Sequence, residues 1–210
     1  MDYPVLGRSP DVAQATVNHL LDGSGNAVPQ SAAHPAPVQY FPKLINASAA
    51  AMTRPANTTP YAAGDAVSNS GTAASVTAIA FAAADLADAP VLLSQLAILS
   101  SDSGPAAAGA TFEAWLFNAD PTANGGVGGG DNAAFSQKQA GFIGRMAGTF
   151  VAAADGSLAV LTPVDGSVVA ARPVAGGVTI YALLRTLTAF TPSAAGTSFT
   201  CTLRGVQGRA

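Results

Sequence analysis

Charged side chains are scarce in this chain of 210 residues: they make up 10% of the sequence, and the formal net charge at pH 7 is −3. No basic block or stripe occurs, which argues against direct binding of nucleic acid. No apolar run approaches the roughly 20 residues that cross a bilayer, so we expect no membrane partner. A surface with few charges gives a free monomer little protection against association. The composition therefore favours a protein that packs against copies of itself or against a larger lattice.

Residue types that carry catalysis or bind metals are also few. Cys201 is the only cysteine, so no internal disulfide is possible, and its place in an alternating run predicts a small buried apolar side chain. The two histidines lack the spacing of metal ligands, and Glu113, the only glutamate, is more typical of a surface or ion-paired residue than of a general acid. Asp120 and Asp131 offer oxygens for calcium, but no regular calcium loop is present. We expect no catalytic residues, no metal, no cofactor and no enzymatic activity.

Glycine (22 residues) and proline (14 residues) are frequent, as in a protein with many turns. From Ala47 onward, period-two alternation predicts about nine strands. The expected strands are residues 49–54, 75–81, 91–100, 111–118, 142–151, 157–161, 168–172, 178–187 and 197–204. Turns separate these strands and no βαβ order is evident, so the expected fold class is all-β, with a β-sandwich or jelly-roll-like domain.

The strand expected at residues 91–100 is apolar on both faces, which predicts a central position in the sheet. Strict alternation places its apolar residues on two sides: Leu92, Leu96 and Ile98 on one, and Val91, Leu93 and Leu99 on the other.

The strand expected at residues 111–118 alternates a fully apolar face with a face that holds Glu113, Trp115 and Phe117. Two large aromatic side chains beside the glutamate indicate that this second face is covered too. In the last expected strand, Phe199, Cys201 and Leu203 point inward, whereas Ser198, Thr200, Thr202 and Arg204 point outward.

Residues 1–45 differ from the rest and predict an extended N-terminal arm that precedes a domain of residues 46–210. Four prolines between residues 28 and 42 disfavour regular structure. The segment nevertheless holds too many apolar groups for a purely solvated tail. Our hypothesis is an arm that becomes ordered on a neighbouring subunit or on the lattice below, and the alternative is a flexible leader. The arm residues expected to contact a partner are Tyr3, Leu6, Tyr40 and Phe41.

Residues 53–68, TRPANTTPYAAGDAVS, predict a strand, a structured loop and a second strand. Tyr61 is a large aromatic residue placed where the loop re-enters the sheet. Gly64 is free to take a positive φ, and Asp65 is able to accept a hydrogen bond from a nearby backbone amide. Arg54 and Tyr61 are candidate partner contacts and, equally, corner residues that brace the fold.

The segment RPANTTPYAAGD (residues 54–65) resembles a pattern in virion structural proteins of tailed bacteriophages. Four later segments follow in a similar order: TFEAWLFNADP, GDNAAF, GFIG and LTAFTPSAAGTSFTCTL. The resemblance covers roughly residues 50–205, the size of one domain. It implies a virion protein that decorates and cements the capsid exterior and stabilises the expanded shell. Its implied partners are the major capsid protein and copies of itself, as a homotrimer on the capsid surface.

Two other functions stay open. A head-fibre or tail structural protein would share the same strands and low charge. The pattern Y-x-x-G-D-x-V at residues 61–67 is also similar to the hairpin entry of small chitin- and cellulose-binding modules. That resemblance implies weak glycan binding at an exposed Tyr61, although residues 68–75 lack the flanking aromatic side chains on which those modules stack sugars.

Overall fold

The computed structural model describes residues 20–21, 27–28, 42–123, 129–136 and 141–208. The chain divides into two compact units, Met1–Tyr40 and Phe41–Ala210. In the first unit, β1 (Leu20–Leu21) pairs antiparallel with β2 (Ala27–Val28). The four arm residues expected to contact a partner, Tyr3, Leu6, Tyr40 and Phe41, lie outside the described residues.

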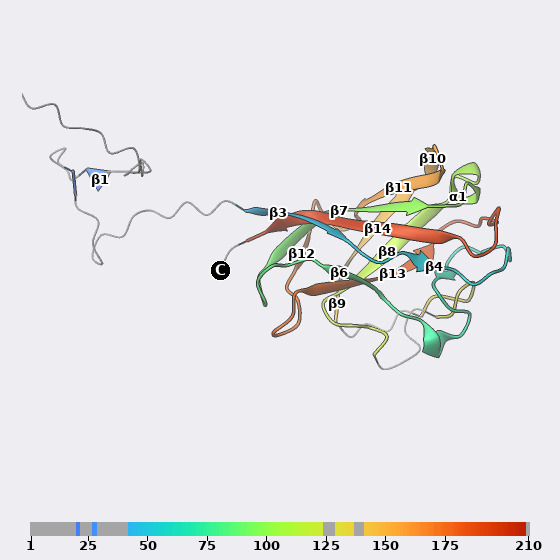
Figure 1. Cartoon of the computed structure of the whole chain (residues 1–210), viewed down its shortest axis with the longest axis horizontal. Helices are drawn as coiled ribbons and strands as arrows, with labels where there is room; N and C mark the ends of the chain where they lie inside the picture. The colour runs from blue at the N-terminus through green and yellow to red at the C-terminus, as the bar shows by residue number, and fades with distance from the viewer. Residues whose placement is uncertain (1–19, 22–26, 29–41, 124–128, 137–140, 209–210) are drawn as a thin grey trace, which may run out of the picture. The chain divides into compact units, whose positions relative to one another are not determined.

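The second unit is almost entirely β structure, which confirms the predicted fold class (Figure 1). Its only helical segments are a 3-10 turn, η1 (Ala73–Ser75), and one short helix, α1 (Gly104–Ala107), among the described residues. Its strands are β3 (Lys43–Ser48), β4 (Met52–Thr53), β5 (Ala66–Val67), β6 (Ile79–Ala82), β7 (Val91–Ser100), β8 (Thr111–Phe117), β9 (Phe142–Thr149), β10 (Val151–Ala153), β11 (Gly156–Pro163), β12 (Val169–Ala171), β13 (Thr179–Thr186) and β14 (Ser198–Gln207).

The strands pair antiparallel in the order β3-β14-β7-β11-β9-β8-β13-β5. We call the layer of β3, β4, β7, β10, β11, β12 and β14 sheet I, and the layer of β5, β6, β8, β9 and β13 sheet II. Strand β11 joins the two layers, because it pairs with β7 over residues 157–161 and with β9 at Thr162 and Pro163. The result is a sandwich-like fold in which one continuous sheet forms both layers (Figure 1).

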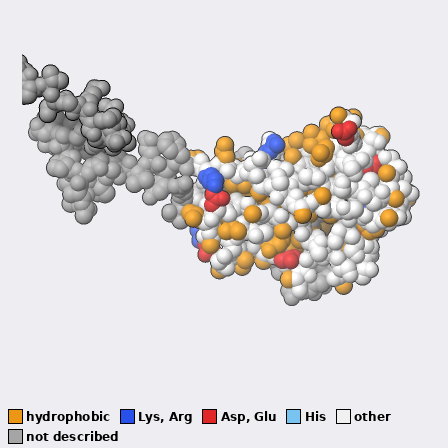
Figure 2. Space-filling view, in the orientation of Figure 1, with side chains coloured by type: hydrophobic (Ala, Val, Ile, Leu, Met, Phe, Trp, Pro, Cys, Tyr) orange, Lys and Arg blue, Asp and Glu red, His pale blue; other side chains and the backbone are white. Residues whose placement is uncertain are grey.

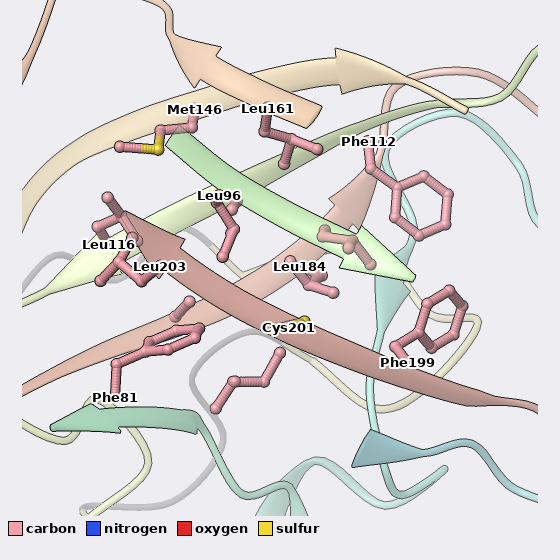
Figure 3. Close-up of a cluster of buried hydrophobic side chains, with 14 of the residues drawn as sticks. Phe81, Leu96, Phe112, Leu116, Met146, Leu161, Leu184, Phe199, Cys201 and Leu203 are labelled. Carbon is pink, nitrogen blue, oxygen red and sulfur yellow. The ribbon is translucent and has the colours of Figure 1, made fainter. Parts of the chain in front are cut away.

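The main hydrophobic core lies between sheet I and sheet II. Leu96 and Leu203 enter it from sheet I, and Leu116, Met146 and Leu184 enter it from sheet II (Figure 3). The thiol of Cys201 is also buried here, as the alternation of the last strand predicted. Burial of these side chains is the principal source of stability for the two layers.

One strand begins earlier than the sequence pattern indicated. Strand β3 covers Lys43–Ser48 and pairs with the C-terminal half of β14, so the predicted domain start at residue 46 falls inside it. The strand expected at residues 49–54 is reduced to β4. Pairing with β14 thus decides where this edge of sheet I lies, because the isolated segment has no strong alternation of its own.

A bulge in β7 changes which side chains face the core. Gln95 of β7 lies opposite Arg204 of β14, and Leu93 lies opposite Gly205. Ser94 is therefore an extra residue between two paired positions. An extra residue reverses the side-chain alternation beyond it. Strict alternation was therefore wrong for this strand: Val91, Leu93, Leu96 and Ile98 are all buried, and Leu92 and Leu99 are exposed.

The outer face of sheet II is covered locally, as the aromatic residues of β8 predicted. Trp115 and Phe117 are buried in a second, smaller cluster with Val76. Phe135 and Phe142 pack against this cluster from the segments that follow the glycine-rich stretch. Sheet II is therefore partly closed on the side that faces away from the main core.

The two faces of sheet I predict opposite responses to shortening a leucine. Leu96→Ala removes a fully buried side chain and is expected to lower the free energy of unfolding by about 2–5 kcal/mol. Leu44→Ala, on the outer face where the side chain is 79% exposed, should change it by less than about 0.5 kcal/mol. Urea unfolding of both variants measures the difference, and equal losses would contradict this assignment of faces.

Candidate functional site

Arg54 and Tyr61, which flank one loop, and the distant Asp131 form a buried polar group that we call the corner network. Arg54 follows β4, where the proline after it ends the extended segment. Tyr61 forms an isolated bridge with Phe190, and Asp131 ends the glycine-rich stretch. All three side chains are buried, so the corner network lies inside the domain and not on its surface.

Hydrogen bonds within the corner network satisfy its charges. The Tyr61 hydroxyl donates to Oδ1 of Asp131 at 2.6 Å and accepts a hydrogen bond from Nε of Arg54. Nη2 of Arg54 lies 3.4 Å from Oδ2 of Asp131. The backbone N–H of Ser68 also donates to Oδ1 of Asp131, at 3.0 Å. A buried cation and a buried carboxylate thus compensate each other, as buried charges require.

The ring of Tyr61 is occupied by intramolecular contacts. The guanidinium carbon of Arg54 lies 4.7 Å from its ring centroid. The ring of Phe190 stacks on it with a centroid distance of 4.6 Å and an angle of 10°. A sugar stacks on an exposed aromatic face, and Tyr61 presents none. These contacts favour the bracing role over the partner-contact role that the sequence left open.

The backbone around Asp131 ties the corner network to the segment after β5. The N–H of Asp131 donates to the carbonyl of Ser70 at 2.6 Å. A Cβ on Gly130 would lie 2.2 Å from the carbonyl oxygen of Gly71, so only glycine fits this close approach. The sequence favoured no role for Asp131 beyond an oxygen ligand for calcium. The missed signal is Arg54, a buried cation that needs a carboxylate partner.

The predicted turn before β5 is confirmed. Gly64 has a φ of +93°, and Oδ2 of Asp65 accepts a hydrogen bond from the backbone N–H of Ala62 at 2.7 Å. This turn places Tyr61 against Phe190 at the point where the loop meets sheet II.

A second polar group, the Glu113 cluster, spans three adjacent strands of sheet II: the buried Glu113 and Trp115 on β8, and the partly buried Arg145 on β9 and Arg185 on β13. Oε2 of Glu113 accepts hydrogen bonds from Nε of Arg185 and from Nε1 of Trp115, both at 2.6 Å. Oε1 of Glu113 accepts from Nη1 of Arg145 at 3.2 Å. Of the two roles expected for the lone glutamate, surface or ion-paired, the structure shows the ion-paired one.

Electrostatics in the Glu113 cluster are balanced. Arg145 forms a second ion pair with Asp165 at 3.1 Å, so two guanidinium groups face two carboxylates. The guanidinium of Arg185 also lies over the ring of Trp115, at 5.4 Å from the centroid. The cluster therefore holds β8, β9 and β13 together beneath the aromatic cover of sheet II.

The described part of the chain contains no group of three or more side chains that could hold a metal ion. None of the helices in that part has the length and apolar character needed to cross a bilayer. No protein-family model matches the chain, and comparisons with curated proteins and with solved structures also give no match.

Removing the carboxylate of the corner network should destabilise the domain strongly. Asp131→Ala leaves the guanidinium of Arg54 buried without its counter-charge and is expected to cost about 3–5 kcal/mol of unfolding free energy. Asp165→Ala is the matched control, because it removes an ion-paired carboxylate that is 73% exposed and should cost less than about 1 kcal/mol. Chemical denaturation of the two variants decides between a bracing and a dispensable corner network.

Alkaline pH should weaken the folded state through two buried acids. Burial raises the pKa of the Cys201 thiol to about 12. Burial, aided by the carboxylate of Asp131, raises the pKa of Tyr61 as well. In the unfolded chain these groups ionise at about pH 8.5 and 10. Because the folded state holds both protons more tightly, the free energy of unfolding should be highest below about pH 8 and should fall as the pH rises toward 12.

Urea unfolding at neutral and alkaline pH measures this dependence, and Cys201→Ala provides the comparison. The variant lacks the ionisable thiol and keeps the Tyr61 hydroxyl. Its unfolding free energy should therefore fall less steeply above about pH 9. A wild-type unfolding free energy that is independent of pH up to about 11 would contradict the assigned burial of both groups.

Proposed function

We propose that this protein is a bacteriophage virion structural protein that decorates and cements the capsid exterior. The observation that supports the proposal is the outer face of sheet I. Leu44, Leu92 and Leu99 on this face are 79%, 42% and 47% exposed, and Val151 and Val160 are exposed beside them. No described part of the chain covers these side chains.

An outer sheet face of this kind is unusual for a monomer in water. In an antiparallel sandwich, the residues that face solvent are normally polar. Figure 2 shows hydrophobic side chains gathered near β10 and β11, with few charged groups on the visible face. An exposed apolar surface of this kind is typical of a protein that associates with a partner.

The mechanism that follows is physical and not chemical. Capsid expansion exposes sites between coat subunits, and the bound protein buries apolar area worth about 25 cal/mol per Å². Repetition at symmetric sites, with the protein as a homotrimer, multiplies weak contacts into avidity. Because the protein binds the expanded shell and not its precursor, binding stabilises the expanded shell by mass action. The arm residues Tyr3, Leu6, Tyr40 and Phe41 are proposed as further contacts.

The buried polar groups support this role indirectly. The corner network and the Glu113 cluster join strands and loops through charges that are shielded from water. Rigid elements hold a binding surface in one geometry, which lowers the entropy lost on association. A head-fibre or tail position would use the same outer face, so the experiment must also locate the protein.

Cryo-EM of the source particle should show the protein at repeated sites on the capsid exterior. Adding the purified protein to particles that lack it should raise the temperature at which shells release their genome, because the protein binds only the expanded shell. Bovine serum albumin at the same concentration is the control for non-specific protection. Particles without this protein, or density only at a fibre or tail, would contradict the capsid assignment.

A further inference from the structure

We propose that the outer face of sheet I docks on a protein surface that presents apolar side chains around a carboxylate, and that this carboxylate pairs with Arg204. The inference rests on the proposed function, and it assigns the face, the central residue and the chemistry of the partner. The occupant is a subunit of the lattice and not a second copy of this chain.

The pairing register aligns the outward side chains of sheet I in rows across the strands. At one end of the face, the row is wholly apolar: Leu44, Val206, Leu92 and Ala170. Toward the other end, the last row is Thr200, Leu99, Leu158 and Val151. Two apolar rows therefore lie on either side of a more polar middle.

Among the described outward residues that pair across this face, Arg204 in the middle is the only charged one. Asn46, Arg204 and Gln95 form one row, and Ser48, Thr202, Ala97 and Val160 form the next. Arg204 is exposed and makes no ion pair within the described residues. A cation that lies between a wholly apolar row and a mixed row loses hydration when a partner covers it, so a partner must supply an anionic group.

Charge argues against a second copy on this face. A symmetric dimer applies the same patch to itself, so two copies that meet at the centre of the face would bring two Arg204 side chains together. Like charges that face each other across an interface cost several kcal/mol. A partner with a carboxylate at this point gains a charge-assisted hydrogen bond instead.

Area points to a lattice as well. A row that crosses four strands is about 19 Å wide, and the outward rows extend over about 23 Å along the strands. The footprint of the face is therefore roughly 450 Å². A patch of this footprint suits a repeated lattice, where several copies that bind together multiply a modest contact.

The first test removes the apolar rows. The double variant Leu92→Asp and Leu99→Asp changes two outward side chains and should leave the core intact, which circular dichroism and the melting temperature verify. Its binding to source-particle shells that lack the protein, measured by co-sedimentation, should weaken at least about 10-fold. The matched control is Leu187→Asp, a 37% exposed leucine after β13, which should bind these shells as the wild type does.

The second test asks whether the partner presents a carboxylate to Arg204. Arg204→Glu should weaken binding to the same shells more than Arg204→Gln, because the reversed charge repels an acidic partner. The control for added negative charge is Leu187→Glu, at the exposed position after β13. Raising the salt concentration should weaken binding of the wild type more than that of Arg204→Gln, since only the wild type has an ion pair to screen.

The outcomes separate this inference from the proposed function. If the wild type binds shells and both outer-face variants bind equally well, the face is not the interface, although the capsid role survives. If the wild type fails to bind shells, the proposed function itself fails. If sedimentation velocity shows wild-type dimers that the Leu92→Asp and Leu99→Asp variant cannot form, the occupant is a second copy and the inference is overturned.

Discussion

A buried arginine that must find a carboxylate within the same chain organises one end of this protein. Arg54 follows β4 of sheet I, Tyr61 lies in the loop that meets sheet II, and Asp131 comes from the end of the glycine-rich stretch. Because an unpaired buried charge is expensive, these three segments can pack only in an arrangement that brings the two charges together. The segment between β4 and β5 thereby acquires one conformation, although it contains little regular structure.

The outer sides of the two sheets differ: polar groups are paired on sheet II, and apolar groups are exposed on sheet I. The Glu113 cluster and its aromatic neighbours occupy the outer side of sheet II, where charges are paired and shielded. The outer side of sheet I has the opposite character, with leucine and valine exposed and a single arginine at the middle. The polar side of the molecule is internally satisfied, whereas no described residue covers the apolar side. This asymmetry is the physical basis of the proposed role in a virion.

Local patterns predicted the strands well where one strand carries its own alternation. β8 and β14 have the faces expected from period two, and the turn at Gly64 and Asp65 forms as its residues indicate. The pattern failed in β7, since a single bulge at Ser94 reverses the alternation and no local signal marks it. It failed also at β3, which is a strand because β14 offers it a partner.

The sequence by itself determined the all-β class and the buried state of Cys201, because each depends on composition or on period-two spacing within one segment. Only the tertiary structure decided that Asp131 is the partner of Arg54, and that apolar rows of sheet I face outward. Those features depend on which distant segments become neighbours and in which register. Pairing free energies across the whole sheet set that register, and spacing along one strand does not contain it.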